Sequence, residues 1–320
     1  MSKIAKTLII IAVALVLVGS IIFCVMMAAV KWDFSKLGTV KYESNTYEVN
    51  EEFSNISLDT DTEDIFFVPS DDGKCKVVCY ESENLKHSVT VKDGALTVSL
   101  IDTRKWYEHI GFGFGNSKIT VYLPDSEYSA LKIEESTGDI EIPAYFKFRS
   151  IDISVSTGDV KCYVAEADTV KIAASTGNIS VQNTSSGLID LSLSTGNVSI
   201  SGVTCSGDIK VALSTGKTQL TNITCKNVIS SASTGDIYLK NVIASEKFSI
   251  ERDTGDVNFD DSDAAEIFVE TDTGDVRGSL LTEKVFITKT DTGSIDVPKS
   301  TSGGICEITT DTGNIRITVK

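Results

Sequence analysis

The residues in this sequence that could do chemistry are aspartates that recur at a fixed interval near the C-terminus. They stand two residues before or one residue after a repeated glycine, and they are Asp253, Asp272, Asp291 and Asp311 in the first set and Asp256 and Asp275 in the second. If equivalent positions stack at the ~4.8 Å spacing of paired strands, neighbouring carboxylates repel by on the order of 1 kcal/mol per pair in water. Calcium between the coils would cancel this repulsion. In the earlier repeats, serine replaces the first aspartate, so the alternative is a corner that needs no metal or other cofactor.

Cysteine and histidine are the other candidate ligands and nucleophiles, with seven cysteines and two histidines in the chain. No cysteine pair has the spacing of a zinc site with a histidine nearby. Cys205 and Cys225 each stand nine residues after a repeated glycine, so we expect thiols stacked on adjacent coils rather than a disulfide. Cys75 and Cys79 are four residues apart and can share one face of a strand. We expect no disulfide scaffold, because the cysteines are few and irregularly spaced.

Two classes of function compete for such a chain. Parallel β-helix enzymes that process polysaccharides use clustered carboxylates, a basic residue or histidine, and long loops that form a cleft. Here the repeats are short and even, and both histidines, His87 and His109, lie outside them. The sequence contains no nucleophile motif and no phosphate-binding loop. We therefore expect a non-catalytic binding module and keep a polysaccharide-processing enzyme as the alternative.

The aspartates belong to a repeated Ser/Asp-Thr-Gly-Asp/Asn corner that sets the architecture. Its glycines are 19 or 20 residues apart, and they are Gly138, Gly158, Gly177, Gly196, Gly216, Gly235, Gly255, Gly274, Gly293 and Gly313. This period is typical of a solenoid, in which each repeat forms one coil. Apolar residues alternate with polar ones on both sides of each glycine, which predicts two short strands per coil. The inward-facing positions three residues before and two residues after each glycine are an odd number of residues apart. In a straight strand their side chains would point to opposite faces, so the chain must bend between them, and glycine relieves the strain of this bend.

The segment before the regular repeats contains strand-like runs and an aromatic interruption. We expect residues 52–134 to form an N-terminal cap and the first coils, and residues 135–320 to form the regular solenoid. The strand pattern is interrupted by four aromatic residues, Trp106, Tyr107, Phe112 and Phe114. They would either plug the open end of the core or form an interaction loop for a membrane or a partner. At the other end, the strand from Ile315 to Lys320 is predicted to be an unpaired edge.

An apolar segment near the N-terminus is long enough to cross a membrane. Residues 8–30 are almost entirely apolar, and about 20 such residues span a bilayer. Lys3 and Lys6 precede the segment, so the positive-inside rule places residues 1–7 in the cytoplasm and the C-terminal domain outside the cell. The alternative is a cleaved secretory signal, although the apolar run exceeds the usual ~7–15 residues of a signal core. Residues 31–51 would then be a juxtamembrane linker.

The charge of the chain narrows the range of partners. With 29 Lys+Arg and 45 Asp+Glu, the net charge is −16. This balance argues against nucleic acid and anionic lipid headgroups as partners. The sequence does not set the oligomeric state or the identity of a ligand.

The sequence also resembles a known bacterial family. The resemblance rests on the repeated Ser-Thr-Gly-Asp-Ile corner, first seen at residues 136–140, on the tract from Arg104 to Pro124, and on the N-terminal apolar segment. These features are similar to the β-strand-repeat family of unknown function labelled putative adhesin, which includes LiaG-like proteins of Gram-positive envelope-stress operons. The resemblance implies an all-β, right-handed parallel β-solenoid on the outer face of the cell membrane. Such a protein would bind cell-wall glycan or another envelope protein, or assist envelope-stress signalling, and the family brings no catalytic residues.

Overall fold

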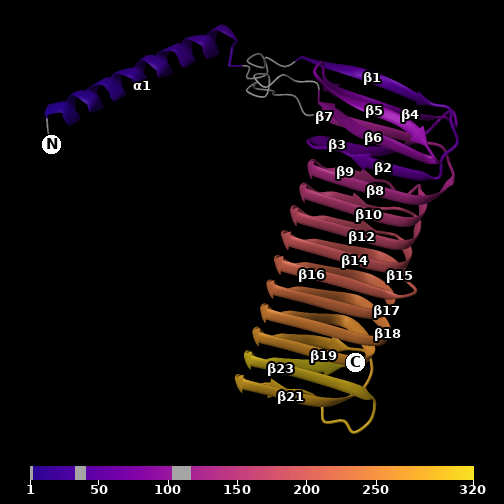
Figure 1. Cartoon of the computed structure of the whole chain (residues 1–320). Helices are drawn as coiled ribbons and strands as arrows, with labels where there is room; N and C mark the ends of the chain where they lie inside the picture. Colours follow the sequence, from indigo (N-terminus) through magenta and orange to yellow (C-terminus); the bar gives the residue numbers. More distant parts are fainter. Residues whose placement is uncertain (1–2, 33–40, 103–116) are drawn as a thin grey trace.

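A computed structural model describes residues 3–32, 41–102 and 117–320 of the chain. One helix, α1 (Lys3–Ala29), precedes a stack of strands, and the described chain after it is all β (Figure 1). The helix is long and apolar enough to cross a membrane. The aromatic residues of the expected interaction loop lie outside the described residues, so their role stays a prediction.

The stack is a parallel β-solenoid in which each coil contributes a strand before and a strand after the glycine corner (Figure 1). The strands before the corner form one face, which contains β8 (Glu127–Thr137), β10 (Lys147–Thr157), β12 (Glu166–Thr176), β14 (Ser185–Thr195) and β16 (Asp208–Thr215). The strands after it form the other face, which contains β9 (Ile140–Ile142), β11 (Val160–Cys162), β13 (Ile179–Gln182) and β15 (Val198–Cys205). Three longer strands contribute to both faces, and they are β17 (Thr218–Thr234), β18 (Ile237–Thr254) and β19 (Val257–Thr273).

The core follows the apolar columns that the repeat predicts. Ile153 pairs in register with Ile133 on one side and Ile172 on the other, and all three side chains are buried. Equivalent Ile, Val and Leu side chains from successive coils therefore share one interior column, whose burial drives folding. The predicted thiol stack is also present, because Thr204 pairs with Thr224 and a buried, unbridged cysteine follows each of them.

Glycine is required at the corners because successive coils approach each other closely there. A β-carbon on Gly216 would lie 1.6 Å from the carbonyl oxygen of Gly196, and the φ angle of Gly216 is 143°. Apart from Gly293 in the outermost coil, each corner glycine donates its N–H to the threonine carbonyl of the next coil, as Gly196 does to Thr215 at 3.0 Å. The corner therefore excludes any side chain as well as favouring the backbone conformation of glycine.

The N-terminal cap closes the first coils with antiparallel strands. It contains β1 (Tyr42–Val49), β2 (Asn55–Asp59), β3 (Glu63–Pro69), β4 (Cys75–Ser82), β5 (Leu85–Lys92), β6 (Ala95–Asp102) and β7 (Ser117–Leu123). β2, β3, β6 and β7 join the parallel stack, whereas β4 pairs antiparallel with β1, β5 and β7. The expected linker, residues 31–51, is corrected here because it contains β1. The pattern missed this strand because only Val49 of β1 is buried and its other residues are half-buried or exposed, so polar and apolar residues do not alternate clearly.

The last coil of the sequence is not the last coil of the stack. The C-terminal strands are β20 (Val276–Leu280), β21 (Lys284–Thr292), β22 (Ile295–Asp296), β23 (Gly304–Thr312) and β24 (Ile315–Val319). β23 lies between β19 and β21, and β24 lies between β20 and β22. The predicted unpaired edge from Ile315 to Lys320 is therefore wrong, and the outer edge is the coil of β21 and β22 (Figure 1).

The apolar content of the two coils explains this order. Ile308 and Ile315 of the last coil are fully buried, whereas the equivalent positions of the outer coil are Thr288, which is half-buried, and Ile295, which is 45% exposed. Placing the more apolar coil inside removes more hydrophobic surface from water. A buried ion pair also fixes the outer coil, because the Lys284 Nζ lies 2.7 Å from Asp263 Oδ1 in β19.

Candidate functional site

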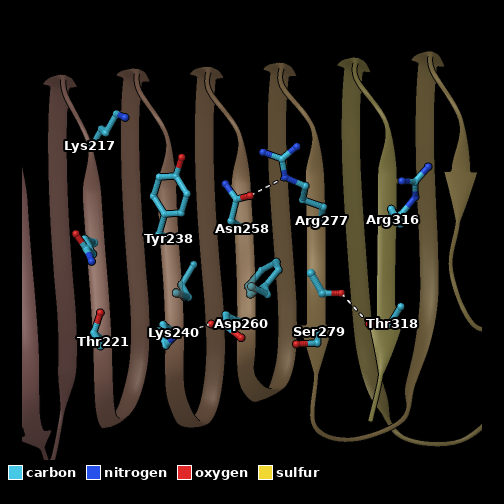
Figure 2. A pocket seen from close by; sticks show the side chains of 14 residues that line it. Lys217, Thr221, Tyr238, Lys240, Asn258, Asp260, Arg277, Ser279, Arg316 and Thr318 are labelled. Atoms are coloured by element: carbon cyan, nitrogen blue, oxygen red, sulfur yellow. Dashed lines mark hydrogen bonds and ion pairs between the residues drawn. The ribbon is translucent and has the colours of Figure 1, made fainter.

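A groove of about 780 Å³ runs across the face formed by the strands that follow the glycine corner (Figure 2). It crosses β17, β18, β19, β20 and β24. It therefore includes part of the last coil of the sequence, β23 and β24, which is inserted between earlier coils and is called the inserted coil below. Its lining side chains come from the third and fifth positions after each glycine, which point outward because the second and fourth positions point into the core. The groove therefore arises from the repeat itself and not from a long loop.

Two rows of side chains border the groove (Figure 2). The first row contains Gln219, Tyr238, Asn258, Arg277 and Arg316. The second row contains Thr221, Lys240, Asp260, Ser279 and Thr318. Leu239, Phe259 and Gly278 lie between the rows, and Lys217 stands at one end. The inserted coil decides part of this composition, because Arg277 pairs in register with Arg316 and not with Asp296 of the outer coil.

Cations concentrate in this groove, although the protein as a whole is acidic. Four of its lining residues are Lys or Arg and one is Asp. The Arg277 Nη2 lies 3.0 Å from Asp256 Oδ2, and its Nε donates to Asn258 Oδ1 at 2.8 Å. The Lys240 Nζ lies 3.0 Å from Asp260 Oδ2. These ion pairs are exposed and contribute little to stability, so the cations can exchange their partners for a ligand.

Tyr238 provides an aromatic surface in the same row. It is 38% exposed, and its hydroxyl donates to Asp236 Oδ2 at 3.1 Å. Desolvation and this hydrogen bond raise the pKa of the Tyr238 phenol, so the group stays neutral at physiological pH. An aromatic ring beside hydrogen-bond donors is the arrangement that contacts both the apolar and the polar sides of a ligand.

The structure places the predicted aspartates in two columns at the corners. The first column follows the coil order of the stack, so it runs Asp253, Asp272, Asp311 and Asp291. All four of these residues are exposed. The second column continues from Asp256 and Asp275 to Asn314 of the inserted coil.

The second column is held by hydrogen bonds between coils. Asp256 Oδ1 accepts from the N–H of Asp275 at 2.9 Å, and Asp275 Oδ1 accepts from the N–H of Asn314 at 2.8 Å. The Oδ2 atom of Asp256 lies 3.0 Å from Arg277 Nη2, and the Oδ2 atom of Asp275 lies 3.9 Å from Arg277 Nη1. These contacts offset the repulsion that suggested calcium, and the calcium ladder stays an untested prediction.

Sequence reasoning missed two groups of residues. The groove residues were missed because outward positions carry no repeating residue type. The available signal was the concentration of Lys and Arg at the third and fifth positions after the later glycines. The second group is Cys79, Glu81 and His87, which come together in the cap. Its members could not be grouped because the pairing of β4 with β5 is not visible in the repeat.

The described residues form a β-solenoid with a groove on the face of the strands that follow the glycine corner. The sequence matches the family model Toastrack DUF4097 over residues 53–212 and 204–320, and the chain belongs to this family. No curated protein matches the sequence.

Solved structures share the fold at low sequence identity. A putative adhesin from Parabacteroides distasonis is 14% identical with a TM-score of 0.51, and the match covers 88% of this chain and 98% of that one. A putative adhesin from Parabacteroides merdae is 10% identical with a TM-score of 0.50 and the same coverage of both chains. At this identity the likeness supports the fold and not the function.

Proposed function

We propose that this protein is a non-catalytic binding module that α1 anchors in the cell membrane, with the N-terminus in the cytoplasm and the solenoid outside. Two proteins of the same fold are described as putative adhesins, and we extend a role in surface binding to this chain because of the groove and not because of the likeness itself. The apolar helix and the two lysines near its start support the anchor and its orientation.

The ligand that we propose for the groove is an acidic glycan of the cell envelope. The observation that carries this proposal is the set of four cations beside Tyr238 on a protein of net charge −16. Lys and Arg bind carboxylate and phosphate groups through charge-assisted hydrogen bonds, and the ring offers an apolar face to a sugar. The rows run along the stack, so they would contact successive units of an extended polymer.

A binding role fits the groove better than glycan cleavage. Most glycosidases place two carboxyl groups about 5–9.5 Å apart across the scissile bond. Among the described residues that line the groove, the only carboxylate is Asp260, which is paired with Lys240. This composition supports the non-catalytic module over the polysaccharide-processing enzyme.

The test is binding of the full chain, purified in detergent, to acidic and neutral glycans of equal length, with and without calcium. We expect selective binding of the acidic glycans that weakens as salt is added. Arg277→Gln should weaken binding about tenfold or more, because each charge-assisted hydrogen bond contributes roughly 1.5–3 kcal/mol. The matched control is Lys161→Gln, since Lys161 occupies the same position in an earlier coil and pairs with Glu141. Equal binding of neutral glycans, or equal loss in both variants, would refute the proposal.

The anchor and the role in envelope stress have separate tests. Protease added to intact cells should degrade the solenoid and spare the N-terminus, and the opposite result would reverse the orientation. If α1 contributes to envelope-stress signalling, replacing residues 8–30 with an unrelated membrane span should change that signalling. Unchanged signalling would limit α1 to anchoring.

A further inference from the structure

Four ionisable side chains meet in the largely apolar interior of the N-terminal cap, and the buried carboxylate of Glu135 in β8 lies next to them. The inward face of β4 continues from Val77 through Cys79 to Glu81, and the facing side chains are His87 of β5 and Glu63 of β3. None of Cys79, Glu81, His87 and Glu63 is more than 3% exposed. Burying charged groups costs several kcal/mol per group unless they are paired or bind a metal. A specific interaction must therefore stabilise this cluster.

Three members of the cluster have the chemistry and proximity of metal ligands. Cys79 Sγ, a carboxylate oxygen of Glu81 and a ring nitrogen of His87 lie within 4.8 Å of one another. Within residues 3–32, 41–102 and 117–320, no other three His, Cys, Asp or Glu residues approach this closely. Thiolate, imidazole and carboxylate are the ligands that zinc prefers in proteins.

Surrounding groups hold the Glu81 carboxylate in place. Its Oε1 accepts hydrogen bonds from Asn45 Nδ2 at 2.7 Å and from the Tyr47 hydroxyl at 3.2 Å. Its Oε2 accepts from the backbone N–H of His87 at 2.7 Å. Metal-binding carboxylates are commonly oriented by outer hydrogen bonds of this kind.

The two ring nitrogens of His87 have different surroundings. Nδ1 lies 2.7 Å from Oε2 of Glu81, one of the candidate ligands. Nε2 has no hydrogen-bond partner among the described residues, and Glu63 Oε1 lies 3.6 Å from it. The other oxygen of Glu63 accepts from the backbone N–H groups of Asp61 and Thr62 at 2.9 and 2.8 Å. Glu63 is thus fixed where the free N–H of a metal-bound histidine usually finds a carboxylate.

We propose that Cys79, Glu81 and His87 bind a divalent metal ion of the zinc class, with Glu63 as the carboxylate that orients His87. The ion would link β4 to β5 and close the cap where the apolar core ends. Because the side chains are enclosed, the site would be structural. A metal-free hydrogen-bonded cluster is the competing arrangement.

The test uses the untagged full chain, produced in medium with zinc or cobalt because the enclosed site must be loaded during folding. We expect close to one bound ion per chain by elemental analysis, and a thiolate-to-cobalt charge-transfer band in the cobalt protein. Cys79→Ser and His87→Gln should lose both signals. Cys75→Ser is the matched control, because Cys75 is a buried residue of the same strand that is not in the cluster. Glu63→Gln should weaken metal binding by about 10–100-fold.

Stability provides an independent measurement. A chelator should lower the unfolding temperature of the wild type and of Cys75→Ser but not that of Cys79→Ser. If Cys79→Ser does not fold, the cobalt spectra of the wild type, Cys75→Ser and His87→Gln decide the question. A folded wild type that holds no metal and shows no cobalt–thiolate band would overturn the proposal. A band that disappears in Cys75→Ser and persists in His87→Gln would also overturn it.

Discussion

Replacing one corner glycine by alanine tests the physical basis of the stack. In Gly216→Ala, the new β-carbon would start 1.6 Å from the Gly196 carbonyl oxygen and must move to about 3 Å from it. Separating these two coils strains the hydrogen bonds that join them, from the N–H of Gly196 to the Thr215 carbonyl (3.0 Å) and from the N–H of Val198 to the Lys217 carbonyl (2.9 Å). Two weakened hydrogen bonds cost about 2 kcal/mol, and alanine at positive φ costs about 1–2 kcal/mol. The expected loss in the free energy of unfolding is therefore about 3–4 kcal/mol.

The matched control is Gly94→Ala, in the turn between β5 and β6. Gly94 also has a positive φ, of 75°, but no atom lies within 4 Å of the position of its β-carbon. This variant should lose only the backbone contribution, about 1–2 kcal/mol. Urea unfolding of residues 41–320, followed by circular dichroism, would compare the two variants through their midpoints. If Gly216→Ala loses no more stability than Gly94→Ala, close contact between coils is not the reason for the repeated glycine.

Three further predictions concern the inserted coil and two buried groups. A thiol crosslinker that spans about 5 Å should join Arg277→Cys to Arg316→Cys, whose positions are register partners, and not Arg277→Cys to Asp296→Cys, whose positions are separated by β24. The reverse result would mean that the coils stack in sequence order. Lys284→Met should lower the free energy of unfolding in urea by roughly 3–5 kcal/mol, because it leaves Asp263 buried without its partner. The control Lys289→Met breaks only an exposed pair with Asp291 and should cost less than about 1 kcal/mol. Similar losses in the two variants would contradict the role of the buried pair. Burial raises the pKa of Glu135, in β8, from 4.5 to about 7. The neutral carboxyl therefore contributes stability that is fully present below pH 4.5 and is lost as the pH rises through 7. Glu135→Gln should therefore gain up to about 3 kcal/mol over the wild type between pH 5 and pH 8, and a constant difference between the two proteins over that range would refute the assignment.

The repeat was sufficient to predict the regular part of the fold. Glycine spacing and period-two alternation identified the coils, their core columns and the corners, because each of these features is set within one repeat. The reason for glycine was only partly predicted. The sequence indicated backbone strain, whereas the structure adds the carbonyl of the neighbouring coil, as at Gly216 and Gly196.

The features that the sequence did not predict depend on pairing between distant segments. The repeat period predicts that the coils stack in sequence order. The last two coils break that order because the coil of Ile308 buries more apolar surface than the coil of Thr288, and the period alone does not reveal this difference. The cluster of Cys79, Glu81 and His87 likewise depends on the antiparallel strands of the cap, which do not follow the repeat. The cations of the groove lie on the solvent side, where packing does not restrict residue type.

The inserted C-terminal coil limits how this protein can fold and evolve. Strand β24 must enter between β20 and β22, so the coil of β21 and β22 cannot take its native position until β23 and β24 have been synthesised. Repeats duplicated within residues 135–273 would lengthen the rod, whereas a repeat appended after Lys320 would emerge from inside the stack and collide with the outer coil. Natural variation in the length of such rods should therefore arise by internal duplication.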